Sequence, residues 1–199
     1  MASLGRGARG VKTMGSHSAL AVRRIATPLG PMVAVAGVRG LCLLEFARGA
    51  GQARGATAAR VRRLGARAGG RPDRRAAAHL DQLARELRAY FTGRLTRFRV
   101  RLAPQGTPFQ RSVWRRVRAI RYGSVSTYER VARAIGRAKA QRAVGRANGD
   151  NPLAIVVPCH RLVGADGALR GYGGGLWRKR RLLELEGALV RGGRWAASR

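Results

Sequence analysis

The stretch from Thr107 to Ala147 constrains the fold more than any other, because glycines and capping residues divide it into three short helical patterns. Thr107 is a favourable N-cap residue, and Pro108 suits the first turn of a helix. The apolar residues of this helix recur every three or four positions: Phe109, Val113, Val117 and Ile120. This spacing predicts an amphipathic helix that buries one face against a core.

Two further helices are expected after this one. Ser126 or Thr127 caps the second helix, and Gly136 ends it. Its apolar positions are Tyr128, Val131 and Ile135. A third, short helix is expected over 139–147 and carries arginines. Helices joined by a turn, with basic residues on the last, are typical of helix-turn-helix nucleic-acid binders, so residues 105–190 predict such a domain.

The first half of the chain predicts a separate, small α/β domain over 18–104. Two apolar runs, 31–36 and 41–46, flank a glycine-containing turn and predict a β-hairpin. Cys42 lies in the second run, and we expect it in the core.

A helix and a further strand are expected after the hairpin. The helix, over 77–92, follows from apolar residues three or four positions apart: Leu80, Leu83, Leu87 and Phe91. Apolar residues that alternate with arginines predict a half-buried strand: Phe98, Val100 and Leu102. Residues 49–76 are rich in Ala, Gly and Arg, and we expect a basic loop or a partly helical excursion there.

Charge is the most unusual feature of the composition. The 199 residues include 41 Lys and Arg against 9 Asp and Glu, a formal net charge of +32. Self-repulsion on this scale destabilises a compact fold, so the charge indicates a polyanionic partner, a coding bias toward arginine, or both. Lysine occurs only at Lys12, Lys139 and Lys179, which supports the coding bias. The nucleic-acid prediction therefore rests on the helical pattern.

The two ends of the chain lack hydrophobic periodicity, and we expect flexible tails at 1–17 and 191–199, the second one basic. Met14 could serve as the start in place of Met1. Two cysteines, no secretory segment and no apolar run of membrane-spanning length favour a reduced, bacterial cytoplasmic setting. Three scattered histidines give no metal-ligand spacing, so we expect no metal site.

Cys159 is the strongest candidate for a reactive residue. The apolar run 153–157 predicts a buried strand that Pro158 ends, which would present Cys159 at a strand end next to His160. A thiol reacts as its thiolate and is commonly activated by an adjacent base or cation. On its own, however, a Cys-His pair is more often a small buried residue beside a solvated histidine.

Four motifs around this pair resemble those of one protein family. They are Asn151-Pro152, Pro158-Cys159-His160-Arg161, Gly171-Tyr172-Gly173-Gly174-Gly175-Leu176 and Leu182-Leu183-Glu184-Leu185-Glu186-Gly187. Together they resemble the C-terminal domain of the O6-alkylguanine-DNA alkyltransferases, also called methylated-DNA-protein-cysteine methyltransferases. The resemblance covers about 107–187 and extends loosely back to about Thr27. It implies an RNase H-like sheet in the α/β domain and a mainly α, winged-helix-like helix-turn-helix domain after it.

The resemblance implies DNA repair by one irreversible transfer. The alkyl group of O6-alkylguanine, and of O4-alkylthymine, would move to Cys159 as a thioether, so each molecule would act once. The expected partner is double-stranded DNA that contains O6-alkylguanine. We expect no cofactor, no membrane association, and a monomer that joins the nucleoid when bound to DNA. Nothing in the sequence indicates a preference for methyl or for larger alkyl groups.

Glu186 is expected to complete a catalytic set with Cys159 and His160. It lies beside an apolar stripe of leucines, so its carboxylate points partly inward and requires a buried partner. His160 is the natural partner, because the glutamate would orient the imidazole while the imidazole, through a water, removes the thiol proton. Glu184 is the alternative acid, but it lies off the apolar face and does not match the Glu-Gly ending of the family motif.

The third helix and the start of the second are assigned to DNA. The resemblance implies that Arg142 enters the duplex and fills the place of an extruded guanine. Ala143 and Gly145 leave the helix face thin enough for a groove. Tyr128 would face the target nucleotide, help to rotate its phosphate and donate toward the guanine leaving group. The alternatives are a solvated arginine and a tyrosine that only packs on the first helix.

Seven residues are expected around the base pocket. They are Asn151, Val157, Pro158, Tyr172, Gly173, Gly174 and Lys179. Asn151 would chiefly fix the turn that leads to Cys159. The glycines would form a flexible loop over the pocket, and Lys179 would lie at its side.

Three other functions remain possible from the sequence. An alkyltransferase-like protein binds the same lesion without transfer, but that class replaces the nucleophile, and Cys159 is intact. A helix-turn-helix regulator or an RNA-binding protein would explain the arginines but not the spacing of Cys159, His160 and Glu186. A cysteine hydrolase is the weakest alternative, since nothing resembles an oxyanion-hole loop.

Overall fold

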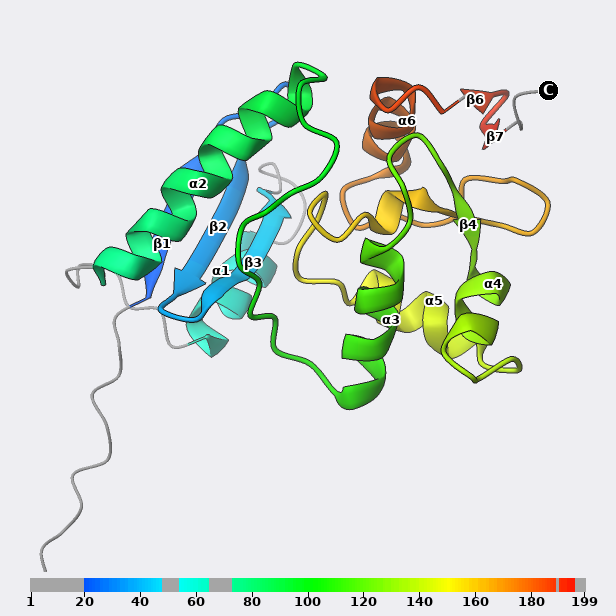
Figure 1. The fold of residues 1–199 in the computed structure, drawn as a ribbon, viewed down its shortest axis with the longest axis horizontal. Coiled ribbons are helices and arrows are strands. Elements are labelled where there is room, and N and C mark those ends of the chain that lie inside the picture. Colours follow the sequence, from blue (N-terminus) through cyan, green and yellow to red (C-terminus); the bar gives the residue numbers. More distant parts are fainter. Residues whose placement is uncertain (1–19, 48–53, 65–72, 189, 196–199) are drawn as a thin grey trace, which may run out of the picture.

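The computed structural model describes residues 20–47, 54–64, 73–188 and 190–195. The first half contains β1 (Ala21–Ile25), β2 (Met32–Gly37), β3 (Gly40–Phe46), α1 (Arg54–Arg63) and α2 (Arg74–Phe91). The second half contains α3 (Pro108–Arg118), β4 (Ser126–Thr127), α4 (Tyr128–Ala134), α5 (Gln141–Gly149), the 3-10 helix η1 (Cys159–Arg161), β5 (Leu162–Val163), α6 (Leu176–Leu185), β6 (Val190–Arg191) and β7 (Arg194–Trp195). A small sheet domain therefore lies beside a mainly helical one (Figure 1).

The first half is a three-stranded antiparallel sheet in the order β1-β2-β3, with a helix on each face. The predicted hairpin is confirmed as β2 and β3. Helix α2 covers one face and buries five residues: Ala76, Leu80, Leu83, Leu87 and Tyr90. It begins three residues before the predicted position 77, because Asp73 caps it by accepting from the backbone N–H groups of Arg75 and Ala76.

The opposite face of the sheet is covered by α1. Val35 and Leu43 of the sheet pack there against Val61 and Leu64. Part of the segment 49–76 is thus helical, and 49–53 and 65–72 lie outside the described residues. Cys42, expected in the core, is instead half-buried.

The predicted strand at 98–102 is wrong as a strand, although its burial alternates as expected. Phe98 and Val100 are buried, but only Leu102 forms a bridge, to Leu41 of β3. The backbone N–H groups of Arg99 and Val100 donate instead to the carboxylate of Glu86 on α2, at 3.0 and 3.1 Å. A side chain therefore binds the amides that a neighbouring strand would otherwise take.

The helical half begins with the predicted capping of α3 and α4. Thr107 and Gln110 form a reciprocal capping box at the start of α3, and Thr127 caps α4. The last helix of the three spans 141–149 and not 139–147, and Ala140, which precedes it, makes no side-chain capping hydrogen bond. Helices α3, α4 and α5 pack against one another, as the helix-turn-helix pattern requires.

The apolar run 153–157 is a buried loop, and the predicted strand is wrong. Leu153 forms one isolated bridge with Leu44 of β3, after which the chain turns through Ile155, whose φ is +70°. Asn151 causes this turn: its side-chain amide donates to the carbonyl of Val157 at 2.8 Å, and its oxygen accepts from the N–H of Leu153 at 3.0 Å. A side chain that binds both ends of the run closes it into a loop.

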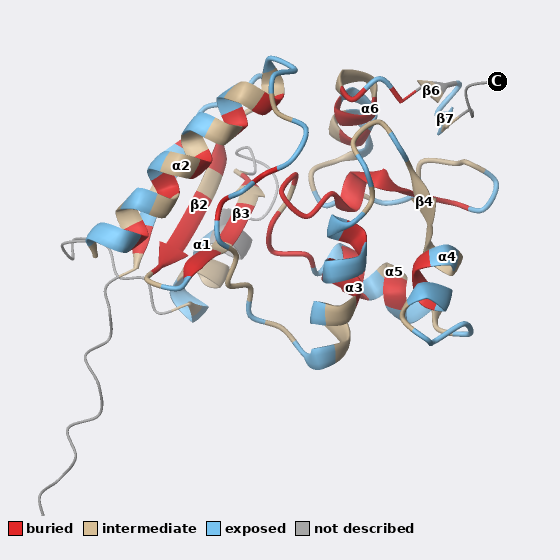
Figure 2. Cartoon of the chain, viewed as in Figure 1, coloured by how far each residue is buried: buried red, intermediate tan, exposed pale blue. Residues whose placement is uncertain are grey.

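Residues 191–195, expected as part of a tail, belong instead to the short β6–β7 hairpin, which begins at Val190. The expected tail at 1–17 and the last residues, 196–199, lie outside the described residues. The domain boundary at 104 stays a prediction, because a single hydrophobic cluster runs through both halves (Figure 2). No helix in the part of the chain that the structure describes is long and apolar enough to cross a membrane.

Every one of the nine carboxylates in the chain accepts a hydrogen bond. These acids are Glu45, Asp73, Asp81, Glu86, Glu129, Asp150, Asp166, Glu184 and Glu186. Three of them accept from backbone amides: Asp73 at the start of α2, Glu86 from the segment that follows α2, and Asp166 from Ala168. Each of the few negative charges is therefore engaged in a hydrogen bond within the structure.

The turn between β2 and β3 gives a stability prediction. Gly40 has a φ of +135°, and an added Cβ would lie 2.5 Å from the carbonyl oxygen of Arg101. Gly136 also has a positive φ, +71°, but open space around it. We expect Gly40→Ala to lower the free energy of unfolding by about 3 kcal/mol or more and Gly136→Ala by about 1 kcal/mol. Urea denaturation measures both, and equal losses would contradict the assigned contact.

Candidate active site

Cys159 opens onto a cavity of about 400 Å³. The sheet half contributes Phe46 and Arg60 to its lining, and the helical half contributes Tyr128 and Tyr172. Cys159 begins the 3-10 helix η1 and is only 7% exposed, so the thiol lies at the bottom of a recess. The structure thus mounts the thiol at a helix start and not at a strand end.

Six residues predicted at the site line this cavity. They are Tyr128, Gly145, Asn151, Tyr172, Gly173 and Gly174. Three predicted pocket residues do not: Val157 is buried behind the loop, Pro158 lines a different cavity, and Lys179 is fully buried. Lys179 donates to the carbonyls of Leu162 and Arg170, both at 2.6 Å, so backbone oxygens hold its ammonium group behind the site.

Glu186 is the centre of the buried hydrogen-bond network. Its side chain is fully buried, and its oxygens accept from Tyr90, His160 and Arg161. His160 Nε2 lies 2.9 Å from Oε1, and the guanidinium of Arg161 binds both oxygens at 2.8 Å. Burial by itself would raise the pKa of Glu186, but the hydrogen bonds from His160 and Arg161 outweigh it and bring the pKa to about 2. The carboxylate is therefore ionised at neutral pH.

The ionised carboxylate determines the tautomer of His160. Burial lowers the pKa of His160, so the ring is neutral at pH 7. A carboxylate only accepts hydrogen bonds, so Nε2 of the neutral ring carries the hydrogen and Nδ1 keeps its lone pair. Among the described residues, Nδ1 is buried and has no hydrogen-bond partner. The ring therefore offers an unprotonated nitrogen within the site.

The state of the Cys159 thiol follows from its burial. Burial raises the pKa of Cys159, and the Asn151 amide and the Lys179 charge lower it only in part. The resting group at neutral pH is therefore the neutral thiol. A neutral thiol becomes a strong nucleophile only if a base takes its proton during the reaction.

Tyr90 and Arg161 belong to this buried network, and sequence reasoning identified neither. The hydroxyl of Tyr90, on α2, donates to Glu186 Oε1 at 2.7 Å across 96 positions of sequence. Burial, followed by the charge of Glu186, raises the pKa of Tyr90, so this hydroxyl stays a donor. Arg161 lies within a motif that the sequence analysis quoted, but in a chain with 41 basic residues its position alone gave no signal.

Glu184, the alternative acid, points away from the site. It forms exposed ion pairs with Arg180 at 2.7 Å and Arg181 at 3.1 Å. Exposed pairs of this kind on one helix stabilise little. The structure therefore places His160 beside Glu186 and not beside Glu184.

The cavity contains polar atoms that lack a partner among the described residues. The side-chain oxygen of Asn148 and the hydroxyl of Tyr172 are buried and unpaired. Asn148 was not predicted, yet it lines the cavity and its amide donates to the carbonyl of Cys159 at 3.4 Å. Burial, followed by the nearby Cys159, raises the pKa of Tyr128, so its hydroxyl is also a donor at neutral pH. Such groups favour a polar ligand that can hydrogen-bond to them.

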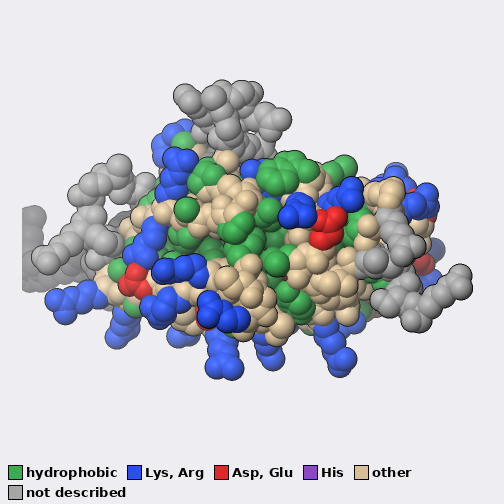
Figure 3. Space-filling model, turned by 90° about the horizontal axis from the view of Figure 1, so that it is seen from above, with side chains coloured by type: hydrophobic (Ala, Val, Ile, Leu, Met, Phe, Trp, Pro, Cys, Tyr) green, Lys and Arg blue, Asp and Glu red, His purple; other side chains and the backbone are tan. Residues whose placement is uncertain are grey.

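Helix α5 places its predicted residues on two sides. Gly145 lines the cavity, and a Cβ there would lie 3.8 Å from the Tyr128 ring. Arg142 and Ala143 line a surface depression at the N-terminal end of α3, outside the cavity. On the face drawn in Figure 3, many lysine and arginine side chains project from the surface, with few acids among them. Within the described residues, no group of three or more His, Cys, Asp or Glu could hold a metal ion.

Known proteins match the chain over both halves. Residues 108–188 match the family described as "6-O-methylguanine DNA methyltransferase, DNA binding domain". A methylated-DNA–protein-cysteine methyltransferase of Methanosarcina barkeri is 41% identical over 162 residues, which cover 81% of this chain and 94% of that protein. One from Methanosarcina acetivorans is 54% identical over 107 residues, 54% of this chain and 69% of that protein.

Solved structures agree with these relatives. The crystal structure of Mycobacterium tuberculosis O6-methylguanine methyltransferase superposes with a TM-score of 0.68 at 40% identity, and covers 87% of this chain and 96% of that one. A structure of the M. tuberculosis protein in complex with DNA gives a TM-score of 0.66 at 42% identity, and covers 83% and 91%. The likeness therefore includes the sheet half as well as the helical half.

The Glu186 network predicts a loss of stability on mutation, and the corresponding change at Glu184 is the control. Glu186→Gln leaves Arg161 buried without a countercharge, so we expect the free energy of unfolding at pH 7 to fall by about 3 kcal/mol. Glu184→Gln should cost less than about 0.5 kcal/mol. Chemical denaturation of both variants measures the difference.

The same network determines the pH at which the stability difference between wild type and Glu186→Gln disappears. The folded-state pKa of Glu186, about 2, lies below the ordinary glutamate value of about 4.3. The carboxylate therefore contributes its full stability above the unfolded pKa, and this contribution is lost as pH falls toward 2. The gap between wild type and Glu186→Gln should narrow below about pH 4.3. A gap that stays constant to pH 2.5 would contradict the network.

Proposed function

The chain belongs to the methylated-DNA–protein-cysteine methyltransferase family, and we propose on this basis that it repairs DNA by transferring an alkyl group from O6-alkylguanine to its own Cys159. O4-alkylthymine is the second expected lesion. The observation that carries the proposal is the cavity with Cys159 at its base, beside a neutral imidazole whose orientation Glu186 fixes. A non-transferring, alkyltransferase-like binder is not favoured, because the thiol is present.

The transfer is a displacement at the alkyl carbon. The thiol proton of Cys159 passes to Nδ1 of His160 through a water, and Glu186 stabilises the imidazolium that forms. The sulfur attacks the alkyl carbon, the bond from that carbon to guanine O6 breaks, and guanine takes the electron pair and a proton. The hydroxyl of Tyr128 is the proposed donor, since Tyr128 and Cys159 line the same cavity. The product is a thioether, so each molecule acts once.

The proposed substrate pose is an extruded guanine within the cavity. A protein thiol cannot reach O6 in the stacked duplex, and extrusion costs a few kcal/mol. The unpaired Asn148 oxygen and Tyr172 hydroxyl would bind the polar edge of the base. The loop at 171–174, which lines the cavity, would cover the base.

Helix α5 is the proposed contact to double-stranded DNA. Its small residues, Ala143 and Gly145, permit close approach to a groove, and Arg142 is proposed to fill the space that the extruded base leaves.

An RNase H-like sheet is supported by the antiparallel order β1-β2-β3 with α2 on one face. The short β4–β5 pair beside α4 supports the winged-helix-like assignment. One chain contains every group that the transfer needs, which favours action as a monomer.

The nucleophile is tested by mass measurement. After incubation with duplex that contains O6-methylguanine, we expect one added methyl group on the peptide with Cys159. Cys159→Ala should gain no methyl group while it still binds the alkylated duplex, and Cys42→Ser should react like wild type. A methyl group on Cys42, or on the Cys159→Ala protein, would overturn the proposal.

The role of Arg142 is tested by a comparison of substrates. Arg142→Ala should slow transfer from a paired lesion at least tenfold, yet change transfer from the free base O6-methylguanine less than twofold, because only the duplex has a space to fill. Arg24→Ala, which removes an exposed arginine from β1, is the matched control and should change neither rate. Equal losses on both substrates would assign Arg142 to the pocket or to the fold.

A further inference from the structure

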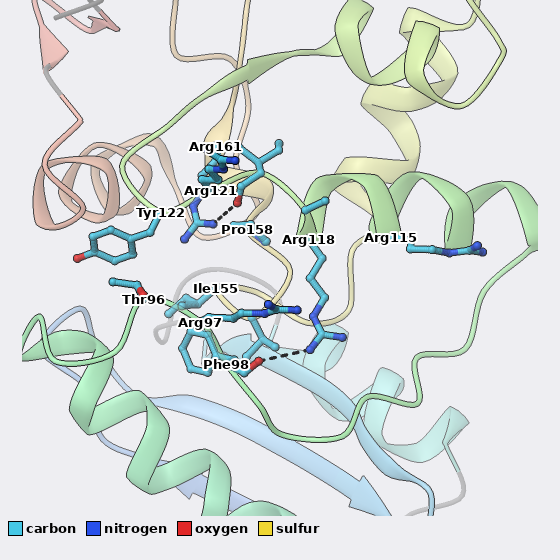
Figure 4. A pocket seen from close by; sticks show the side chains of 13 residues that line it. Thr96, Arg97, Phe98, Arg115, Arg118, Arg121, Tyr122, Ile155, Pro158 and Arg161 are labelled. Atoms are coloured by element: carbon cyan, nitrogen blue, oxygen red, sulfur yellow. Dashed lines mark hydrogen bonds between the residues drawn. The ribbon is translucent and has the colours of Figure 1, made fainter.

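A second and larger cavity, of about 810 Å³, lies between the two halves at the C-terminal end of α3. The segment 96–98 forms one side of it, and the end of α3 with residues 119–122 forms the other (Figure 4). We call it the arginine cleft, after the five arginines that line it: Arg97, Arg115, Arg118, Arg121 and Arg161. The proposed alkyl transfer makes no use of it.

The arginine cleft carries a strong positive charge. No Asp or Glu lines it, and Arg161 alone among its arginines is neutralised, by Glu186. The other four form no ion pair with any carboxylate in the described part of the chain. The guanidinium of Arg118 makes one hydrogen bond, at 3.4 Å to the carbonyl of Phe98, and keeps its other donors free. Four uncompensated cations around one cavity attract an anion.

Helix electrostatics explain only part of this cluster. Arg115 and Arg118 lie in the last turn of α3, where cations favourably oppose the helix dipole. Arg97 and Arg121 belong to no helix, and they face the cleft from opposite sides. Their positive charges repel one another and those of α3, a cost that a bound polyanion would reverse.

The floor of the arginine cleft is apolar and aromatic. Phe98 and Ile155 line it but are only 7% and 1% exposed, so the half-buried Tyr122 is the aromatic side chain that a ligand can contact. The hydroxyl of Tyr122 donates to the carbonyl of Leu185 at 3.0 Å, which fixes the ring. Rigid aromatic rings among cations are the features by which proteins bind single-stranded nucleic acid, through stacked bases and contacted phosphates. A volume of about 810 Å³ lies in the upper part of the usual range for ligand sites.

The arginine cleft is separate from the site of alkyl transfer. The two cavities share no lining residue, and the loop before Cys159 forms a wall between them: Ala154 faces one cavity, and Ile155 and Pro158 face the other. Arg142 lies at the N-terminal end of α3, whereas the cleft lies at its C-terminal end. Eleven residues of helix place these ends about 16 Å apart.

We propose that the arginine cleft binds a short segment of single-stranded nucleic acid, with its phosphates on Arg97, Arg118 and Arg121 and a base against the ring of Tyr122. The cleft would recognise the phosphates and bases of nucleotides, and the bound molecule is a nucleic-acid strand. Because the cleft and the α5 face are separate, the protein holds this strand while a duplex occupies α5. The inference does not depend on alkyl transfer.

A competition experiment tests the arginine cleft. The probe is a fluorescent oligothymidylate of about eight nucleotides, and its anisotropy is measured with unlabelled, undamaged duplex at saturation. We expect the probe to bind in the presence of the duplex. The double variant Arg97→Ala/Arg121→Ala should weaken this binding at least fivefold. It should also reduce the slope of log affinity against log salt by about 1.4, because each lost phosphate contact removes about 0.7.

The matched control is Arg75→Ala/Arg85→Ala, which removes two exposed arginines from α2. It should change probe affinity less than twofold, and both double variants should keep the wild-type melting temperature and methyl transfer to Cys159. Displacement of the probe by duplex, or equal weakening in the two double variants, would overturn the proposal. If ATP at the same phosphate concentration displaces the probe, the occupant is a free nucleotide, and the proposal of a bound strand is wrong. Loss of transfer in wild type, with probe binding intact, would overturn only the proposed function.

Discussion

The buried carboxylate of Glu186 is the interaction on which the site depends. An ion at this depth is strongly unfavourable unless its partners are already in place, and its four hydrogen bonds come from Tyr90, His160 and Arg161. Tyr90 belongs to the sheet half, and the other two belong to the helical half. One of the four hydrogen bonds to this carboxylate therefore comes from α2, so the sheet half, which supplies no nucleophile, helps to position the group that orients the imidazole.

The features that the sequence predicted correctly are those that depend on neighbouring residues. The caps at Thr107 and Thr127 and the β2–β3 turn each depend on a few neighbouring residues, and all formed where the sequence placed them. The inward direction of Glu186 followed from its place beside a leucine stripe. The loop at 153–157 was mistaken for a strand, since apolar periodicity cannot separate the two and the cause lies in the side chain of Asn151.

The remainder of the site depends on contacts between distant segments, which no sequence pattern shows. Tyr90 looks like any core tyrosine of an amphipathic helix until the fold brings it to Glu186. Lys179 follows the pocket loop in sequence and was expected beside it, but helix α6 turns it inward to two backbone carbonyls. Asn148 and Arg60 reach the cavity from opposite halves, so only the assembled molecule identifies them as its lining.

Because 41 basic side chains face only nine acidic ones, most arginines have no acidic partner within the chain. Salt therefore acts in opposite directions on two equilibria. Dissolved ions screen the repulsion among the arginines and favour the folded chain, while they weaken its attachment to a polyanion. At low ionic strength, a bound nucleic acid supplies the negative charges that offset the repulsion among the arginines. The protein free in solution is then its least stable form, and attachment to nucleic acid raises its resistance to unfolding.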